Sequence, residues 1–183
     1  KSDISLLIAR KMKTFKIGGV HPKDQKLSAD KAIDNLALPK QAIIPLSQHI
    51  GAPATPIVTK GENVRVGQLI AKATGFMSAN IHSPYSGTIE KIDNAIDAWG
   101  MASPAIFIKV EGDEWIPEIN RKDDIIRICN LEPAEIIRRI GDAGIVGLGG
   151  ACFPTHIKLT PPPTAKAEVL IINGVECEPY LTC

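Results

Sequence analysis

The residues with the clearest chemical potential lie in the last third of this 183-residue chain. The segment GLGGACFPTHIKL occupies residues 147–159. Gly147, Gly149 and Gly150 remove side chains where the main chain must turn, so backbone N–H groups can approach a ligand closely. Groups of N–H donors bind anions, and Lys158 would add a positive charge beside a phosphate. The segment therefore indicates anion-binding chemistry.

A second segment, LIINGVECEPYL at residues 170–181, places polar side chains after an apolar run. The run EVLIIN has the composition of a buried strand, and α/β proteins usually place ligands at the ends of such strands. Asn173, Glu176 and Glu178 would offer an amide and acceptor oxygens to ring and ribose groups. In the first segment, Phe153 supplies a face on which a planar ring can stack.

A structural interpretation of the first segment stands beside this functional one. Short glycine-rich connections between helices and strands are more often turns than ligand sites. No GK[ST] follows the glycines, which excludes a P-loop, and the segment does not follow a strand in the GxGxxG manner. The residues alone indicate a phosphate or nucleotide loop, with an ordinary turn as the alternative.

A helix is predicted to lead into the glycine-rich segment. In PAEIIRRIGDAG, Glu132 would be the N-cap, Pro133 the first helical residue, and Gly144 the end of the helix. Apolar residues at helical spacing form the expected buried stripe: Ile136, Ile137 and Ile140.

Residues 57–110 alternate short apolar runs with glycine turns, which indicates a compact all-β unit. The pattern resembles the barrel-sandwich hybrid of biotinyl and lipoyl carrier domains, which attach their group to a lysine at a hairpin tip. Alignment on Ser86 and Gly87 places Phe76 at that tip, and phenylalanine has no amine to acylate. The unit is therefore interpreted as a scaffold or docking surface, with His82 in its wall, rather than as a carrier.

Composition and residue spacing argue against several other functions. Basic and acidic residues number 21 and 20, so the formal charge of +1 gives no nucleic-acid signature. The cysteines, at 129, 152, 177 and 183, lack zinc or cluster spacing, and His21 and His49 lack ligand partners, so we expect no metal site and reduced thiols. The apolar runs are too short to span a bilayer, so partner subunits would have to hold the chain at a membrane.

The two glycine-rich phrases, GLGGACFPTHIKL and LIINGVECEPYLTC, resemble those of the RnfC family, which belongs to the Rnf electron-transport complex. They are also similar to the flavin loops of the NADH-binding flavoprotein subunit of respiratory complex I. The likeness to RnfC extends back through KTFKIGGVHP, PLSQHIGAPA and VGQLIA, and so covers nearly the whole chain after Met12.

This resemblance implies roles for individual residues. Lys158 would reach the phosphate of FMN, and four small residues would lie along the cofactor: Gly147, Gly149, Gly150 and Ala151. Asn173 and Glu176 would also contact the flavin. Phe153 and Glu178 would lie on the side of the nicotinamide nucleotide, with NAD(H) as substrate.

The chain departs from the related patterns at three positions in these phrases. Leu148 stands where complex I has arginine, and Val175 where complex I has aspartate. Cys152 stands where the family normally has glycine, and its Cβ is expected to crowd a close approach of the backbone to a ligand.

The function implied by the resemblance is electron transport. RnfC-like proteins exchange a hydride between NADH and FMN and pass electrons to two 4Fe-4S clusters, in a membrane complex that links ferredoxin and NAD to the pumping of sodium ions or protons. The chain would be a peripheral oxidoreductase subunit on the cytoplasmic side of the bacterial inner membrane, held by other subunits and meeting ferredoxin indirectly. A non-catalytic docking module is the alternative.

The expected fold class is α+β. Residues 13–118 would form the barrel-sandwich hybrid with flanking loops, and residues 119–183 the first part of a Rossmann-like α/β domain that binds FMN and NADH. Residues 1–12 would be an upstream segment. The CxxCxxCxxxCP runs that hold the clusters are absent, so we expect a truncated N-terminal fragment that binds FMN weakly and is inactive alone.

Overall fold

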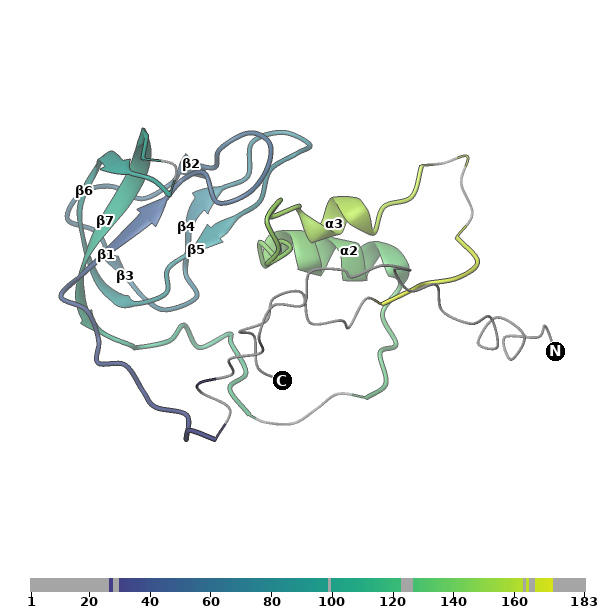
Figure 1. Cartoon of the computed structure of the whole chain (residues 1–183), viewed down its shortest axis with the longest axis horizontal. Helices are drawn as coiled ribbons and strands as arrows, with labels where there is room; N and C mark the ends of the chain where they lie inside the picture. Colours follow the sequence, from purple (N-terminus) through teal and green to yellow (C-terminus); the bar gives the residue numbers. More distant parts are fainter. Residues whose placement is uncertain are drawn as a thin grey trace, which may run out of the picture. The chain divides into compact units, whose positions relative to one another are not determined.

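The computed structural model describes residues 27, 30–98, 100–122, 127–162, 164 and 167–172. Within it, Leu36–Val169 form a compact unit in which strands come first and helices follow (Figure 1). The strands are β1 Gln41–Pro45, β2 Thr55–Pro56, β3 Asn63–Val64, β4 Leu69–Lys72, β5 Ile81–His82, β6 Ser86–Ile96 and β7 Ala102–Gly112. The helices are α2 Pro133–Asp142 and α3 Thr155–Lys158.

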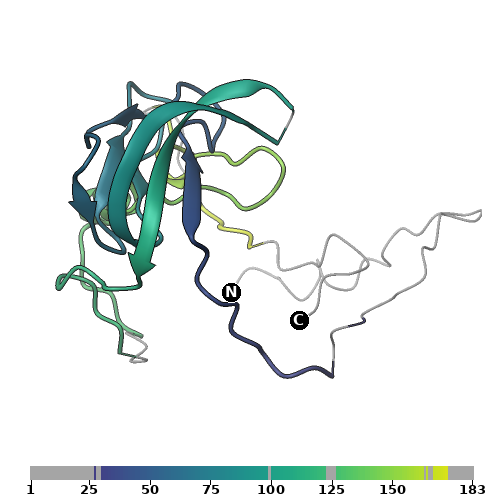
Figure 2. The same ribbon diagram turned by 90° about the vertical axis from the view of Figure 1, so that its left-hand side faces the viewer.

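The strands form two antiparallel sheets. One has the order β1-β7-β6-β3 and the other the order β2-β4-β5. Strands β6 and β7 pair from Ser86↔Gly112 to Ile96↔Ala102, and Figure 2 shows them as a long, curved hairpin. The register shifts between Ser86 and Gly87 and between Ile89 and Lys91. Irregularities of this kind bend a strand and increase its twist, as closing a small barrel requires.

The core is filled by the alternating apolar residues that the sequence pattern predicts. Ile89 of β6 and Ile106 and Ile108 of β7 are fully buried, and they share one hydrophobic cluster with Ile70 of β4. Because these residues come from both sheets, the cluster joins the two sheets into one barrel. Burial of side chains of this size contributes roughly 1.5–3 kcal/mol each.

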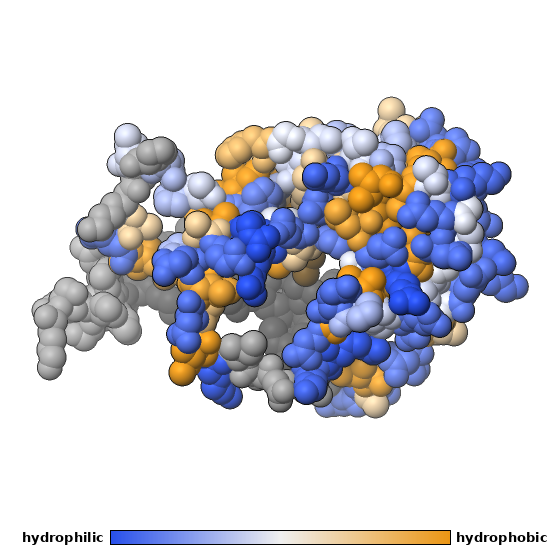
Figure 3. All heavy atoms as spheres, turned by 180° about the vertical axis from the view of Figure 1, so that it is seen from behind, coloured by the Kyte–Doolittle hydropathy of each residue, from blue (hydrophilic) through white to orange (hydrophobic). Residues whose placement is uncertain are grey.

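The surface of this unit still carries apolar residues between charged ones. Seen from behind, hydrophobic patches alternate with hydrophilic surface over the barrel (Figure 3). Among the described residues, neither helix has the length and hydrophobicity that a bilayer-spanning segment needs.

Helix α2 begins and ends as the sequence predicts. Glu132 is its N-cap and Pro133 its first residue, although the Glu132 side chain makes no capping hydrogen bond. At the other end Gly144 has φ +66°, its N–H donates to the Gly141 carbonyl, and the Ile145 N–H donates to the Ile140 carbonyl. This is the Schellman arrangement, which satisfies carbonyls that a helix end would otherwise leave unpaired.

The packing of α2 differs from the prediction of a buried stripe. Its isoleucines at 136, 137 and 140 are only half-buried. Ion pairs on the exposed face compensate in part, since Glu135 accepts hydrogen bonds from Arg138 and Arg139. These bonds, that from Arg138 first, lower the pKa of Glu135 to about 2.

The predicted strand EVLIIN is not formed in the part of it that the structure describes, residues 168–172. These residues have no regular secondary structure, and the side chains from Val169 to Ile172 are 76–85% exposed. A strand needs a neighbour to accept and donate its backbone hydrogen bonds, and no described segment pairs with this one. The apolar composition was therefore an insufficient guide here.

Gly87 should be the most sensitive glycine of the barrel. Its backbone is extended, but a Cβ would lie 2.0 Å from the Lys109 carbonyl oxygen of β7. We expect Gly87→Ala to lower the free energy of unfolding by about 3 kcal/mol, because two paired strands must move apart. Urea denaturation followed by circular dichroism measures this loss.

Gly61→Ala is the matched control, since Gly61 has φ +88° and no atom within 4 Å of an added Cβ. It should cost only about 1 kcal/mol, the penalty of a left-handed backbone. Equal losses in the two variants would contradict the close-approach argument.

Candidate functional site

The glycine loop, residues 147–153, is closed at its base by backbone hydrogen bonds. The Gly147 N–H donates to the Phe153 carbonyl at 2.9 Å, and the Thr155 N–H donates to the Ile145 carbonyl at 3.0 Å. These bonds flank an antiparallel bridge between Val146 and Pro154. The loop therefore projects from a fixed base between α2 and α3.

The tip of the glycine loop presents unpaired donors. The Cys152 N–H donates to the Gly149 carbonyl at 3.1 Å and closes a turn. Within the described part of the chain, the N–H groups from Leu148 to Ala151 make no hydrogen bond, and these residues are exposed. Successive free N–H groups in a turn form a concave donor surface that suits an anion.

The glycines of this loop are not explained by the chain itself. Gly147, Gly149 and Gly150 do not have positive φ angles. An added Cβ would meet nothing within 4 Å at Gly149 and Gly150, and would make only ordinary contacts, from 3.6 Å, at Gly147. Gly144, by contrast, needs both its φ of +66° and its lack of a side chain. The glycine loop therefore leaves open space beside its backbone, as the close approach of a ligand requires.

Strain in the glycine loop is concentrated at Cys152. It has φ +44° and is the non-glycine residue with positive φ among those described. A left-handed backbone costs an L-residue with a Cβ roughly 1–2 kcal/mol. The sequence prediction placed the difficulty in a crowded Cβ, whereas the structure places it in the backbone conformation. The thiol is half-buried, 3.5 Å from the Gly149 carbonyl oxygen.

Lys158 and Phe153 lie together beside the loop. The Lys158 ammonium is 5.8 Å from the centre of the Phe153 ring, within the range of a cation–π contact. Lys158 is exposed in the last turn of α3, while Phe153 is half-buried. Helix α3 packs on α2, where the His156 ring is 3.5 Å from the position of a Cβ on Gly141.

The end of α2 is attached to the barrel at Asn80. The Asn80 side-chain amide donates to the Asp142 carbonyl at 3.1 Å, and a Cβ on Gly144 would lie 2.2 Å from the Asn80 carbonyl oxygen. The oxygen of the same side-chain amide accepts a hydrogen bond from the Ala73 N–H. Asn80 thereby joins the barrel to the helix from which the glycine loop begins.

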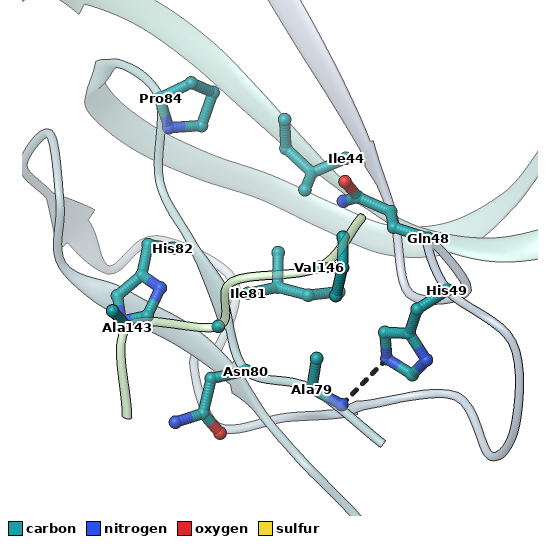
Figure 4. Close-up of a pocket in the computed structure, with 11 residues that line it drawn as sticks. Ile44, Gln48, His49, Ala79, Asn80, Ile81, His82, Pro84, Ala143 and Val146 are labelled. Carbon is teal, nitrogen blue, oxygen red and sulfur yellow. Dashed lines mark hydrogen bonds between the residues drawn. The ribbon is translucent and has the colours of Figure 1, made fainter. Parts of the chain in front are cut away.

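Two histidines lie around a cavity of about 280 Å³ at this junction. In the view of Figure 4, Ile81 and Val146 lie between the His49 and His82 rings. The buried His49 accepts a hydrogen bond from the Ala79 N–H through Nε2, at 3.0 Å, which is a structural role. Burial lowers the pKa of His82, so this ring is neutral at pH 7.

A larger cavity, of about 490 Å³, lies between the glycine loop and the barrel. Its lining is mainly apolar. The barrel contributes residues 45 and 47–50 and the β6–β7 turn at Asp97 and Ala98, and the glycine loop contributes Gly150, Ala151 and Cys152. Cavities of a few hundred cubic ångströms with apolar walls are typical of small-molecule sites.

The structure thus brings together only part of the predicted site. Six of the predicted residues are described and lie in or beside the glycine loop: Gly147, Gly149, Gly150, Ala151, Phe153 and Lys158. Asn173, Glu176 and Glu178 lie outside the described residues. The barrel side of the larger cavity was not predicted, although PLSQHIGAPA had been noted as part of the family resemblance.

Comparison with known proteins agrees with these features. The model of the RnfC barrel sandwich hybrid domain matches residues 13–113, and that of the Nuo51 FMN-binding domain matches residues 140–183. The first match confirms the predicted barrel-sandwich hybrid. The Rossmann-like continuation and the boundaries of the predicted domains stay predictions.

Individual relatives carry the same likeness. The RnfC-type protein of the proton-translocating ferredoxin:NAD(+) oxidoreductase complex of Clostridium ljungdahlii is 46% identical over 173 residues, covering 93% of this chain and 37% of that protein. Its counterpart in the ion-translocating oxidoreductase complex of Rhodobacter capsulatus is 44% identical over 94% of this chain and 33% of that protein. The counterpart in the Na(+)-translocating complex of Acetobacterium woodii is 40% identical over 92% and 38%, respectively.

The chain spans about a third of the length of these relatives. The matched family model covers more than half of the chain, from residue 13 to residue 113. The chain therefore belongs to the RnfC family and corresponds to its N-terminal region.

Proposed function

We propose that this chain is the FMN-proximal part of a subunit that passes electrons between NAD(H), FMN and 4Fe-4S clusters in an ion-translocating complex. The observation that carries the proposal is the glycine loop. Its free N–H groups and its unexplained glycines lie in the segment that matches the Nuo51 FMN-binding domain. When bound, FMN supplies the two-electron and one-electron chemistry, and the protein supplies position and charge.

The residues of the glycine loop fit a flavin phosphate. Four consecutive N–H groups, from Leu148 to Ala151, are free within the described chain, and Gly149 and Gly150 leave space beside the backbone. Lys158 approaches the phosphate from α3, where its long exposed side chain can leave the Phe153 ring and pair with the anion. Phe153 then presents a free face toward a nicotinamide nucleotide.

The remaining predicted contacts complete this proposal. Asn173 and Glu176 bind the flavin, and Glu178 acts with Phe153 on the NAD(H) side. A Rossmann-like domain over residues 119–183 holds these groups, after a barrel over residues 13–118. The cluster ligands are not in this chain, and the two 4Fe-4S clusters belong to the full-length protein.

The partners of the chain follow from what its relatives form. The relatives are named as subunits of ferredoxin:NAD(+) oxidoreductase or ion-translocating complexes. We place the chain peripherally on the cytoplasmic side of the bacterial inner membrane, held by other subunits, with ferredoxin reached indirectly. The pumped ion differs among the names of the relatives, so the family alone does not assign it.

A docking role for the barrel is the second candidate. Phe76, at the position where a carrier domain would hold its acylated lysine, is 74% exposed. An exposed aromatic side chain on a loop tip suits a protein contact. The two functions are compatible, but a docking module alone would leave the free N–H groups of the glycine loop without a role.

Lys158→Gln tests the assignment of the phosphate. We expect it to weaken FMN binding about tenfold and to leave riboflavin binding unchanged, because a charge-assisted hydrogen bond contributes roughly 1.5 kcal/mol or more. Fluorescence titrations into the millimolar range measure both affinities. Lys60→Gln, an exposed lysine of the barrel, is the control. An equal loss for FMN and riboflavin would show that Lys158 does not contact the phosphate.

Cys152→Gly tests the strain in the glycine loop. Glycine accepts φ +44° without a Cβ penalty, so we expect the free energy of unfolding to rise by about 1 kcal/mol and FMN binding to be retained or improved. Cys152→Ala keeps the Cβ while removing the thiol, and should give no such gain. If alanine stabilises as much as glycine, the thiol rather than the backbone is the source of the strain.

A further inference from the structure

We propose that the barrel supplies one wall of the cofactor site. The barrel wall, defined as residues 45–50 with the β6–β7 turn at Asp97 and Ala98, faces the glycine loop across the cavity of about 490 Å³. It receives the planar ring system of the flavin, while the phosphate lies against the glycine loop. This inference rests on the proposed function and adds to it the part of the site that lies outside residues 140–183.

The chemistry of the lining selects the ring rather than the phosphate. Pro45, Ile50 and Ala98 on the barrel side and Ala151 on the loop side present apolar surface. The Asp97 carboxylate, on the same lining, repels an anion. Apolar walls and a carboxylate disfavour a phosphate and suit a flat heteroaromatic ring that carries N–H groups.

The Asp97 carboxylate is held in place by its own strand connection. It accepts hydrogen bonds from the Met101 N–H at 2.9 Å and from the Ser103 hydroxyl at 2.7 Å. Its backbone N–H donates to the Met101 carbonyl at 2.8 Å. The turn therefore offers a fixed surface rather than a mobile tip.

The other half of the barrel wall is equally constrained. The His49 ring binds the Ala79 N–H, and the Gln48 amide donates to the Pro45 carbonyl at 2.9 Å. Just beyond the wall, the Ala52 N–H donates to the Met77 carbonyl and the Ser78 hydroxyl to the Ala52 carbonyl. A wall fixed before the ligand arrives loses little entropy when the ligand binds.

The position of the glycine loop completes the geometry. The attachment of α2 at Asn80 fixes the start of the glycine loop relative to the barrel. Gly150, Ala151 and Cys152 are the loop residues that reach the cavity, and two of them lie at the end of the run of free N–H groups. A single FMN molecule is thus expected to contact donors at one end and apolar barrel surface at the other.

Amide chemical shifts of the isotopically labelled chain test this arrangement even if binding is weak. FMN titrated into the millimolar range should move the amides of Gln48, Ile50 and Ala98 together with those of Gly149 and Gly150, with one Kd. Riboflavin should retain the barrel shifts and reduce the loop shifts. Inorganic phosphate should move the loop amides alone.

The outcomes separate the two proposals. Movement of the loop amides alone with FMN would overturn the barrel wall and leave the proposed function standing. No movement at either place would overturn both. Barrel shifts produced by phosphate as strongly as by FMN would also overturn the assignment of the ring to the wall.

Ile50→Glu tests the barrel wall by substitution, because it puts a charge into the apolar lining. We expect FMN affinity to fall about tenfold or more, a loss of about 1.4 kcal/mol. Ile57→Glu is the control, since Ile50 and Ile57 are 50% and 51% exposed and only Ile50 lines the cavity. Ala98→Glu, on the exposed turn, replaces Ile50→Glu if thermal melting shows that the latter unfolds. Unchanged affinity in a folded wall variant, or equal losses with Ile57→Glu, would refute the proposal.

Discussion

The candidate site depends on a single close approach between main chains, that of Gly144 to Asn80. There is no room for a Cβ at Gly144, because one would lie 2.2 Å from the Asn80 carbonyl oxygen. The same glycine, with φ +66°, ends α2. One residue therefore stops the helix and fixes the helix end to the barrel. The glycine loop begins three residues later, so its position relative to the barrel follows from this contact.

Features with a local physical cause could be predicted from the sequence. Alternating apolar residues placed Ile89, Ile106 and Ile108 in the barrel core, because side chains of a strand alternate between its faces. The start of α2 at Pro133 and its end at Gly144 follow from backbone preferences of those residues. The anion-binding character of the glycine loop likewise follows from residues that are adjacent in the sequence.

Features set by distant neighbours could not be predicted in the same way. The run EVLIIN has strand composition, but no described segment lies beside it to complete its hydrogen bonds. The half-burial of Ile136, Ile137 and Ile140 depends on what packs against α2, which helical spacing does not state. The cavity between the glycine loop and the barrel joins residues about a hundred positions apart, and no periodicity connects Ile50 to Ala151.

The attachment at Asn80 also has a consequence for the order of folding. The hydrogen bond from Asn80 to Asp142 joins residues 62 positions apart, whereas β6 and β7 are consecutive in the chain. Contacts between distant residues bear a larger loop-closure entropy and form more slowly than local ones. During synthesis the whole barrel precedes α2 and the glycine loop, since ribosomes deliver the chain from its N-terminus. The later segment thus meets a finished template, and assembly of the site becomes a docking step rather than a search.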